Sequence, residues 1–164
     1  MEKLLEISEI SRIALLFLNG DDFENVLLDQ IGPTDYDFDK FNGLKKVLLA
    51  VPMIDPSWTV DAILWQPYAC NRRVGMPLVV GTSLPQQGCK RCYLNQEIFS
   101  VLQGGAPCRK DWREGLWSHY EALRNSDDEI VGVLELQVGL KDKKDVSCMD
   151  MFVPPFTLEE DDDE

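Results

Sequence analysis

The sequence lacks the motifs that mark the common classes of enzyme. It contains no Gly-x-Ser-x-Gly elbow, no phosphate-binding glycine loop and no His-Glu-x-x-His pair. His119 is the only histidine. It could titrate near neutral pH or bind a metal, but a single histidine flanked by aromatic residues is more often structural. We therefore expect a protein that is not an enzyme.

Long apolar runs are also missing. Residues 13–18 form the longest run near the amino terminus, which is far shorter than the roughly 20 residues of a membrane helix. Acidic residues precede this run, whereas a signal peptide would have basic residues there and a cleavage site after it. These absences predict a cytoplasmic protein with no membrane partner.

Basic residues are few relative to acidic ones. The chain has 29 acidic and 16 basic residues, for a formal net charge of −13. Six of the acids lie at residues 159–164, and the other 23 still exceed the bases by seven. Such a surface repels phosphate, so nucleic acid is not an expected partner. The tail itself is expected to be a disordered, solubilising end, with docking to a basic partner as the alternative.

The length of 164 residues and the hydrophobic fraction of 45% fit one domain with a core of its own. No Ser/Gly linker interrupts residues 37–140. We expect an N-terminal helical segment over 1–36, a folded domain over 37–150 and a disordered acidic tail over 151–164. We further expect this unit to fold cooperatively.

Hydrophobic periodicity predicts an α+β fold. Helical spacing of apolar residues is found over residues 2–18, in a short segment over 21–30, from about 37 to 51, and over 93–102. Segments rich in β-formers are found over residues 58–68, 76–82, 116–124 and 130–140. The turn residues 125–128 join the last two strands into a hairpin. The order favours a central antiparallel sheet with N-terminal helices and one crossover helix.

The last third of this pattern resembles a known family of sensors. Residues 103–107 (QGGAP) form a glycine-bearing turn, and Trp112 and Trp117 follow it. A YEALR segment at 120–124, a polar turn and an EIVGVL strand at 129–134 complete the pattern. Together these residues resemble the Cache/PAS-like ligand-sensing domains of bacterial receptors, with GAF domains as the near alternative. The resemblance implies a PAS/Cache-like fold and a small-molecule ligand.

Within this resemblance, the aromatic residues are the candidate ligand-binding residues. Aromatic walls with a polar handle are typical of small-ligand pockets, although the same residues can simply fill a core. Many relatives carry an aspartate, often holding a ligand amine, where this chain has Gln137. Strand alternation places Trp117 and His119 on one face of their strand and Tyr120 on the other. The candidate set is Tyr68, Tyr93, Trp112, Trp117, Tyr120 and Gln137.

Four cysteines support a different hypothesis. Cys89 and Cys92 form a Cys-x-x-Cys pair, the spacing with which two thiolates bind tetrahedral zinc. Cys70 and Cys108 lie near predicted turns and could complete the site, which makes zinc a possible cofactor. Nearby basic residues would lower the thiol pKa values and favour thiolates, and a redox pair is the less favoured reading.

The leading hypothesis is therefore a signal transduction module. A small molecule would bind in an aromatic-lined pocket and change how the N-terminal helices meet a partner. That partner is a second copy of the chain or a separate signalling protein. The alternative is a zinc- or redox-binding protein that uses the four cysteines.

Overall fold

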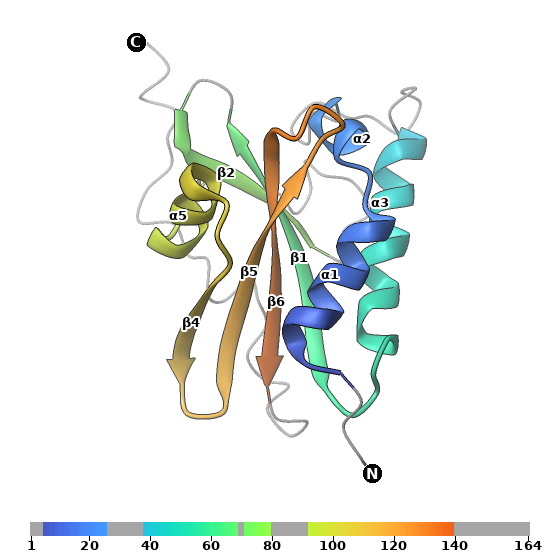
Figure 1. Ribbon diagram of the computed structural model, residues 1–164, viewed down its shortest axis with the longest axis vertical. Helices are drawn as coiled ribbons and strands as arrows, with labels where there is room; N and C mark the ends of the chain where they lie inside the picture. The colour runs from blue at the N-terminus through green and yellow to red at the C-terminus, as the bar shows by residue number, and fades with distance from the viewer. Residues whose placement is uncertain (1–4, 26–37, 69–70, 80–91, 140–164) are drawn as a thin grey trace.

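The computed structural model describes residues 5–25, 38–68, 71–79 and 92–139. These residues form a twisted antiparallel sheet of six strands in the order β3-β2-β1-β6-β5-β4, with helices on both faces (Figure 1). The elements are α1 Ile7–Phe17, α2 Gly20–Asn25, α3 Phe38–Ala50, the 3-10 helix η1 Val51–Met53, β1 Thr59–Tyr68, β2 Asn71–Val79, β3 Cys92–Tyr93, α5 Gln96–Gly104, β4 Cys108–Arg113, β5 Leu116–Arg124 and β6 Ile130–Gly139. The predicted α+β class is confirmed.

Helix α1 begins later than its sequence pattern predicts, because its start is determined by a capping box. Glu6 is the N-cap, and its backbone amide donates to the Glu9 carboxylate at 2.7 Å. From there the apolar positions Ile7, Ile10 and Ala14 turn toward the sheet and are buried. The helical spacing is confirmed, but the residues described before Ile7 are not helical.

Gly20 has a different role from the helix stop that its sequence position predicts. It does not adopt a left-handed conformation, and it is the first residue of α2. The Asn19 side chain caps this helix by accepting from the Asp22 amide at 3.1 Å. Glycine is required because a Cβ at this position would collide with the backbone carbonyl of Arg124. Helix α2 therefore lies against the end of the β5 strand.

Helix α3 agrees with its predicted face. Phe41, Leu44, Leu48 and Val51 are all buried, as their helical spacing predicts. Pro52 follows in η1, which turns the chain toward β1. The exposed face of this helix includes Gly43, at which an added Cβ would meet nothing within 4 Å.

The β5–β6 hairpin also agrees with its predicted form. Asn125 closes the turn by donating its backbone amide to the Glu129 carbonyl at 2.9 Å, and its side chain accepts from the Asp127 and Glu129 amides. Strand β6 pairs with β1 on one side and β5 on the other, and residues 131–138 are all buried. This confirms a central strand covered on both faces.

Three elements on the way to this hairpin differ from prediction. Strand β2 begins at Asn71 rather than residue 76, and the short strand β3 occupies the predicted start of the fourth helix. Strand β4 was not predicted at all, because its alternating exposed positions carry charges such as Arg109 and Asp111. Charged side chains are typical of edge strands, where they discourage pairing with another chain.

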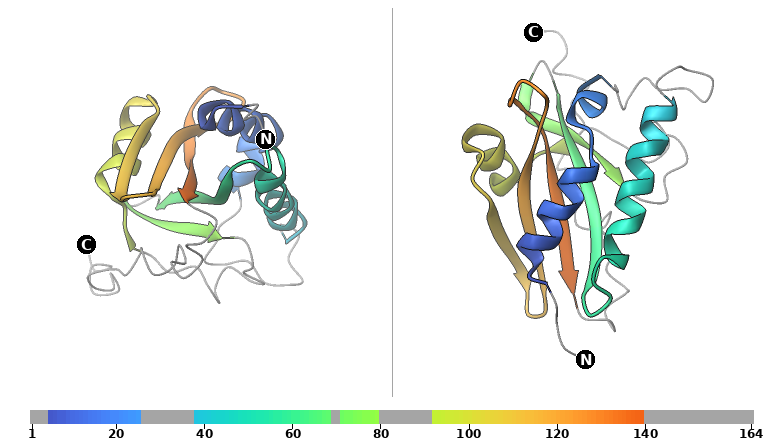
Figure 2. Two further views of the ribbon diagram at one scale, coloured as in Figure 1. Left: turned by 90° about the horizontal axis from the view of Figure 1, so that it is seen from below. Right: turned by 45° about the vertical axis from the view of Figure 1, so that its right-hand side comes forward.

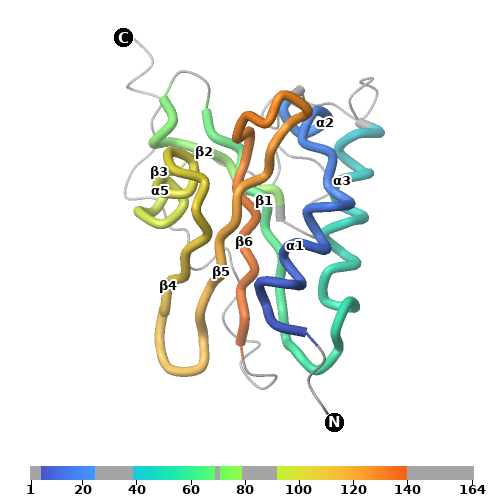
Figure 3. The backbone as a smooth tube through the Cα atoms, in the orientation of Figure 1, coloured from blue at the N-terminus to red at the C-terminus, as the bar shows by residue number. Residues whose placement is uncertain are grey.

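Helices lie on both faces of the sheet (Figure 2), and each face holds a hydrophobic cluster. Helices α1, α2 and α3 cover one face, which holds the larger cluster. Helix α5 covers the other face and contributes Ile98, Val101 and Leu102 to the smaller cluster. It links β3 to β4, the two opposite edges of the sheet, so it is the predicted crossover helix (Figure 3). Gly105, with φ 76°, ends it as predicted.

The predicted division of the chain falls mainly on residues outside this description. The boundary between residues 36 and 37 and the tail over 151–164 both lie there. Within the described ranges, no helix is long and apolar enough to cross a membrane.

Candidate functional site

The candidate site centres on a carboxylate in the middle of the sheet. Glu135 lies on β6, opposite Ile63 of β1 and Tyr120 of β5, and its side chain is fully buried. It belongs to the face of the sheet that α5 covers, because its strand neighbours Leu134 and Leu136 pack in the larger cluster on the opposite face. A buried acid at this position is unusual, because charged side chains are rarely enclosed without a partner.

Donors from several strands converge on this carboxylate. Trp65 of β1 donates its indole Nε1–H to Oε1 at 2.8 Å. Ser118 and Tyr120 of β5 donate their hydroxyls to Oε2 at 2.6 and 3.1 Å. The Gln137 side chain provides a further hydrogen bond. The four lone-pair positions of the carboxylate are therefore matched by four neutral donors.

Two branches leave this centre from the oxygen Oε2. In the first, Ser118 Oγ accepts a hydrogen bond from Trp112 Nε1 of β4 at 2.8 Å. In the second, the Tyr120 hydroxyl accepts from Asn95 Nδ2 at 3.0 Å, and Asn95 is the N-cap of α5. We call this set the Glu135 network. Its members are Trp65, Asn95, Trp112, Ser118, Tyr120, Glu135 and Gln137.

Burial dominates the electrostatics of the network. Desolvation raises the pKa of Glu135 above its ordinary value of 4.5, although each of its four hydrogen bonds acts in the opposite direction. Burial also raises the pKa of the Tyr120 phenol, and the adjacent Glu135 charge adds to this effect. Tyr120 therefore stays protonated and able to donate. Among the described residues no basic side chain forms an ion pair with Glu135.

A second carboxyl lies beside the network. Asp61 of β1 stands opposite Gln137 in the β1–β6 register, two residues from Ile63 and so on the same face of the strand. Desolvation raises the pKa of this carboxyl, although the Asp61 residue is exposed. Lys110 lies nearby on β4, opposite Ser118, but its ammonium group lies over the Trp112 ring at 4.5 Å and 3.6 Å from Glu97. This face of the sheet therefore combines aromatic rings with one buried carboxyl, Glu135, and one exposed carboxyl, Asp61.

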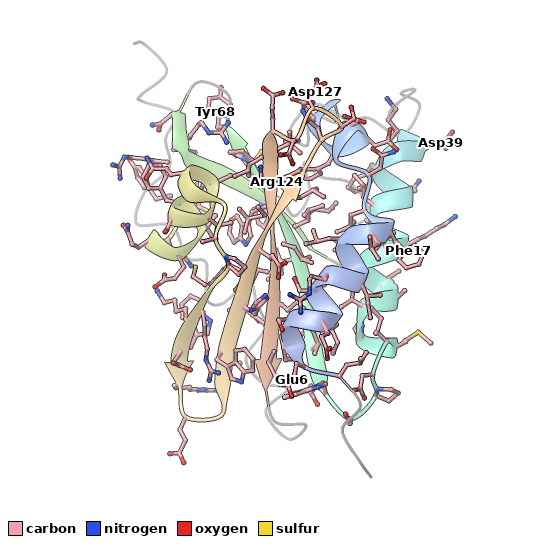
Figure 4. All side chains as sticks on the ribbon, in the orientation of Figure 1. Glu6, Phe17, Asp39, Tyr68, Arg124 and Asp127 are labelled. Atoms are coloured by element: carbon pink, nitrogen blue, oxygen red, sulfur yellow. The ribbon has the colours of Figure 1, made fainter. Side chains whose placement is uncertain are left out.

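Three of the six candidate ligand-binding residues are brought together. Trp112, Tyr120 and Gln137 all belong to the Glu135 network. Tyr93 lies on the edge strand β3 and is 37% exposed. Tyr68 ends β1 at one end of the sheet, which is also the end labelled by Arg124 and Asp127 in Figure 4. Both tyrosines belong to the β1–β2–β3 half of the sheet.

Trp117 lies on the opposite face, as strand alternation predicts, so it does not share a site with Tyr120. Its ring meets Trp58 edge-on with the centroids 6.5 Å apart, and the Arg109 guanidinium lies 3.9 Å from its centroid. His119 lies on the same face, with Nε2 2.8 Å from Glu121 Oε1. Cys108 is on the other face, with its thiol donating to the Glu97 carbonyl of α5, so a Cys108–His119 catalytic pair cannot form.

The zinc hypothesis stays a prediction, because only Cys92 and Cys108 of its four ligands lie among the described residues. Cys92 is buried opposite Gly75, and burial raises the pKa of its thiol to about 11. Desolvation by burial causes this increase, so for Cys92 the direction is opposite to the one that basic neighbours would produce. Cys70 and Cys89, the other half of the proposed site, lie outside the described residues. Within residues 5–25, 38–68, 71–79 and 92–139, no three potential ligands are grouped to hold a metal.

Sequence reasoning missed four members of the network: Trp65, Asn95, Ser118 and Glu135. A signal for Glu135 was present, since residues 134–138 alternate apolar and polar within a strand that is expected to be buried on both faces. A polar residue on a covered face must find partners there. The partners themselves carry no such signal, because Trp65 is 70 positions away in the sequence.

Comparison with known proteins gives matches among solved structures alone. No family model matches the chain, and no curated protein matches it. Among solved structures, the chain is similar to the NLH2 GAF domain of A. aeolicus in an inactive state. The TM-score is 0.46 at 12% sequence identity, and the match covers 85% of this chain and 86% of that one. A likeness of this size does not define a function.

Proposed function

We propose that this chain is a small-molecule-sensing module of the GAF/PAS-like kind. Its ligand binds on the α5 side of the sheet, against the Glu135 network, and the resulting change reaches a partner through the N-terminal helices. The chain acts by binding rather than by catalysis.

The observation that carries this proposal is the burial of Glu135 with only neutral hydrogen-bond partners among the described residues. A fully buried carboxylate with hydrogen bonds from neutral groups alone is costly, since desolvation of a charge opposes folding. A core whose only task is stability is better served by an apolar residue of similar size. Small-ligand sites, in contrast, combine apolar and aromatic walls with a few oriented polar groups. Trp112, Tyr120 and Glu135 have this composition.

Strand β5 supports transmission across the sheet, because its adjacent residues Ser118 and Trp117 face opposite layers. Ser118 belongs to the Glu135 network, and Trp117 packs against Trp58. Trp58 in turn donates its indole N–H to the Leu5 carbonyl at 2.9 Å, immediately before α1. The Leu5 amide donates to the buried Asp55 at 3.0 Å. A shift of β5 would therefore act directly on the start of α1.

The surface of the N-terminal helices supports an output through association. Leu16 and Phe17, on the last turn of α1, are 82% and 70% exposed (Figure 4). Leu49 of α3 and Met53 of η1 are 53% and 76% exposed. Exposed large apolar residues on neighbouring helices are typical of contact surfaces. We propose that the contact is with a second copy of this chain.

The test is a ligand search with a matched variant. Native mass spectrometry of the purified chain would report a co-purified small molecule. Thermal-shift screening of free amino acids, dicarboxylates, purines and cyclic nucleotides would follow. We expect at least one compound to raise the melting temperature of the wild type and to act far less on Glu135→Gln. If hits act equally on both proteins, or if neither method finds a ligand, the proposal is wrong.

A further inference from the structure

We propose that the Glu135 carboxylate controls how firmly the amino end of helix α5 is held on the sheet, through a relay of Tyr120 and Asn95. If a ligand binds against the Glu135 network, helix α5 is the element that responds to it. In this respect the inference rests on the proposed function. Its physical basis is independent of any ligand, because each step is a hydrogen bond of the unliganded chain.

The relay has three consecutive hydrogen bonds. The Tyr120 hydroxyl donates to Glu135 Oε2 at 3.1 Å and accepts from Asn95 Nδ2 at 3.0 Å. The other end of the same amide, Asn95 Oδ1, accepts from the backbone amide of Ile98 at 2.8 Å. One asparagine side chain therefore caps the first turn of α5 and attaches it to the sheet. Its amide can perform both tasks only in one orientation.

The position of Asn95 makes this attachment consequential. It stands between β3, at one edge of the sheet, and α5, which crosses to β4 at the other edge. Later residues of the helix, Ile98, Val101 and Leu102, are fixed by apolar packing. Glu97 also attaches the first turn to β4, since it lies 3.6 Å from the Lys110 ammonium and its carbonyl accepts from the Cys108 thiol. The attachment that includes the N-cap residue itself runs through Tyr120. A change in the partner of Tyr120 should therefore loosen the first turn first.

The network contains its own internal control. Ser118 donates to the same oxygen, Oε2, at 2.6 Å, but its second partner is Trp112 of β4. Removing the Ser118 hydroxyl takes one hydrogen bond from the carboxylate and one from the Tyr120 hydroxyl, but it keeps both hydrogen bonds that join Glu135 to Asn95 through Tyr120. Comparing the two branches separates a directed relay from a general loosening of the core.

Glu135→Gln is the perturbation at the far end of the relay. Trp65 needs an oxygen at the position of Oε1, so the new amide nitrogen must face the hydroxyls of Ser118 and Tyr120. Tyr120 can then no longer donate to residue 135, and its hydroxyl must rotate away from the direction that suits Asn95. We therefore expect weaker capping of α5, although the substituted residue lies on β6.

Amide hydrogen exchange, followed by NMR, measures this directly. The ratio of the Ile98 exchange rate to those of Leu64 and Leu134, in the central strands, removes any change in global stability. We expect Glu135→Gln to raise this ratio roughly two- to ten-fold, the effect of one lost hydrogen bond. Asn95→Ser keeps an N-cap oxygen but has no amide to donate, and it should raise the ratio similarly. The double variant should show little further increase.

Two outcomes would overturn the relay. One is a ratio in Glu135→Gln that stays at the wild-type value while Asn95→Ser raises it. The other is a Ser118→Ala variant that raises the ratio as much as Glu135→Gln, since Ser118 takes part in none of the three hydrogen bonds of the relay. Tyr120→Phe, which keeps the buried ring, gives the same answer if Glu135→Gln does not fold. A failed ligand search leaves these measurements unaffected, so the two proposals fail separately.

Discussion

Gly132→Ala should destabilise the protein through a single methyl group. Gly132 lies on β6, where the ring of Phe23 from α2 rests directly on the strand. A Cβ at this position would lie 2.6 Å from Phe23 Cε2 and 2.9 Å from the backbone carbonyl of Trp65. Carbon atoms pack best at about 3.5–4.0 Å, so the ring would have to move by roughly 1 Å. Neither neighbour yields easily, because Phe23 is fully buried and the carbonyl belongs to a central strand.

The expected magnitude follows from this overlap. Overpacking of a well-filled core costs about 1–3 kcal/mol, and the lower chain entropy of alanine offsets about 0.4–1 kcal/mol of that. We expect the free energy of unfolding to fall by about 1–2 kcal/mol, which corresponds to a melting temperature lower by roughly 2–8 °C. Urea denaturation at neutral pH, with the m-value compared between the two proteins, measures the change.

Gly43→Ala is the matched control, because it makes the same substitution where an added Cβ meets nothing within 4 Å. Gly43 lies within α3 on an exposed position, so alanine should stabilise the protein by about 0.5–1 kcal/mol. Adding Phe23→Leu to Gly132→Ala should make the double variant more stable than the sum of the single effects. If both glycine variants change stability in the same direction, the packing argument is wrong.

Three further predictions concern charge, thiol reactivity and association. Because burial raises the pKa of Glu135 above 4.5, the folded state binds this proton more tightly than the unfolded state, and its contribution to stability falls as pH rises from 4.5 through the folded pKa. Urea titrations at several pH values should therefore show the free energy of unfolding of the wild type falling, relative to that of Glu135→Gln, as the pH rises over that window. A difference that does not change with pH would contradict the raised pKa. A thiol pKa raised from 9.0 to about 11 lowers the thiolate fraction of Cys92 on the order of 100-fold. Peptide mapping after iodoacetamide treatment at pH 8 should therefore find Cys92 unmodified long after a free thiol has reacted. Finally, Phe17→Glu should convert a dimer into a monomer in sedimentation equilibrium. Gln103→Glu, which adds the same charge at an exposed position of α5, should leave the dimer intact. If the wild type is a monomer at high concentration, the proposal that two copies associate is wrong.

The sequence by itself determined those parts of the protein that local patterns encode. Helical spacing from Phe41 to Val51 predicted α3 and its buried face. Polar turn residues between two apolar runs predicted the β5–β6 hairpin and the central position of β6. Alternation also placed Tyr120 and Trp117 on opposite faces of β5. These features depend on contacts close in the sequence or on a residue's own preference, so one segment is enough to recognise them.

Only the tertiary structure decided the candidate site and the strands at the edges of the sheet. Glu135 receives its hydrogen bonds from Trp65, 70 residues earlier, and from Ser118 and Tyr120, 17 and 15 residues earlier. That convergence depends on the register of β1 and β5 on β6, which a one-residue shift would reverse by turning every side chain to the other face. Gly20 shows the same limit, since it reads as a helix stop until the Arg124 carbonyl is seen to lie against it. Local sequence therefore encodes the helices and strands, but the register in which the strands pair determines which polar side chains come within hydrogen-bond distance of one another.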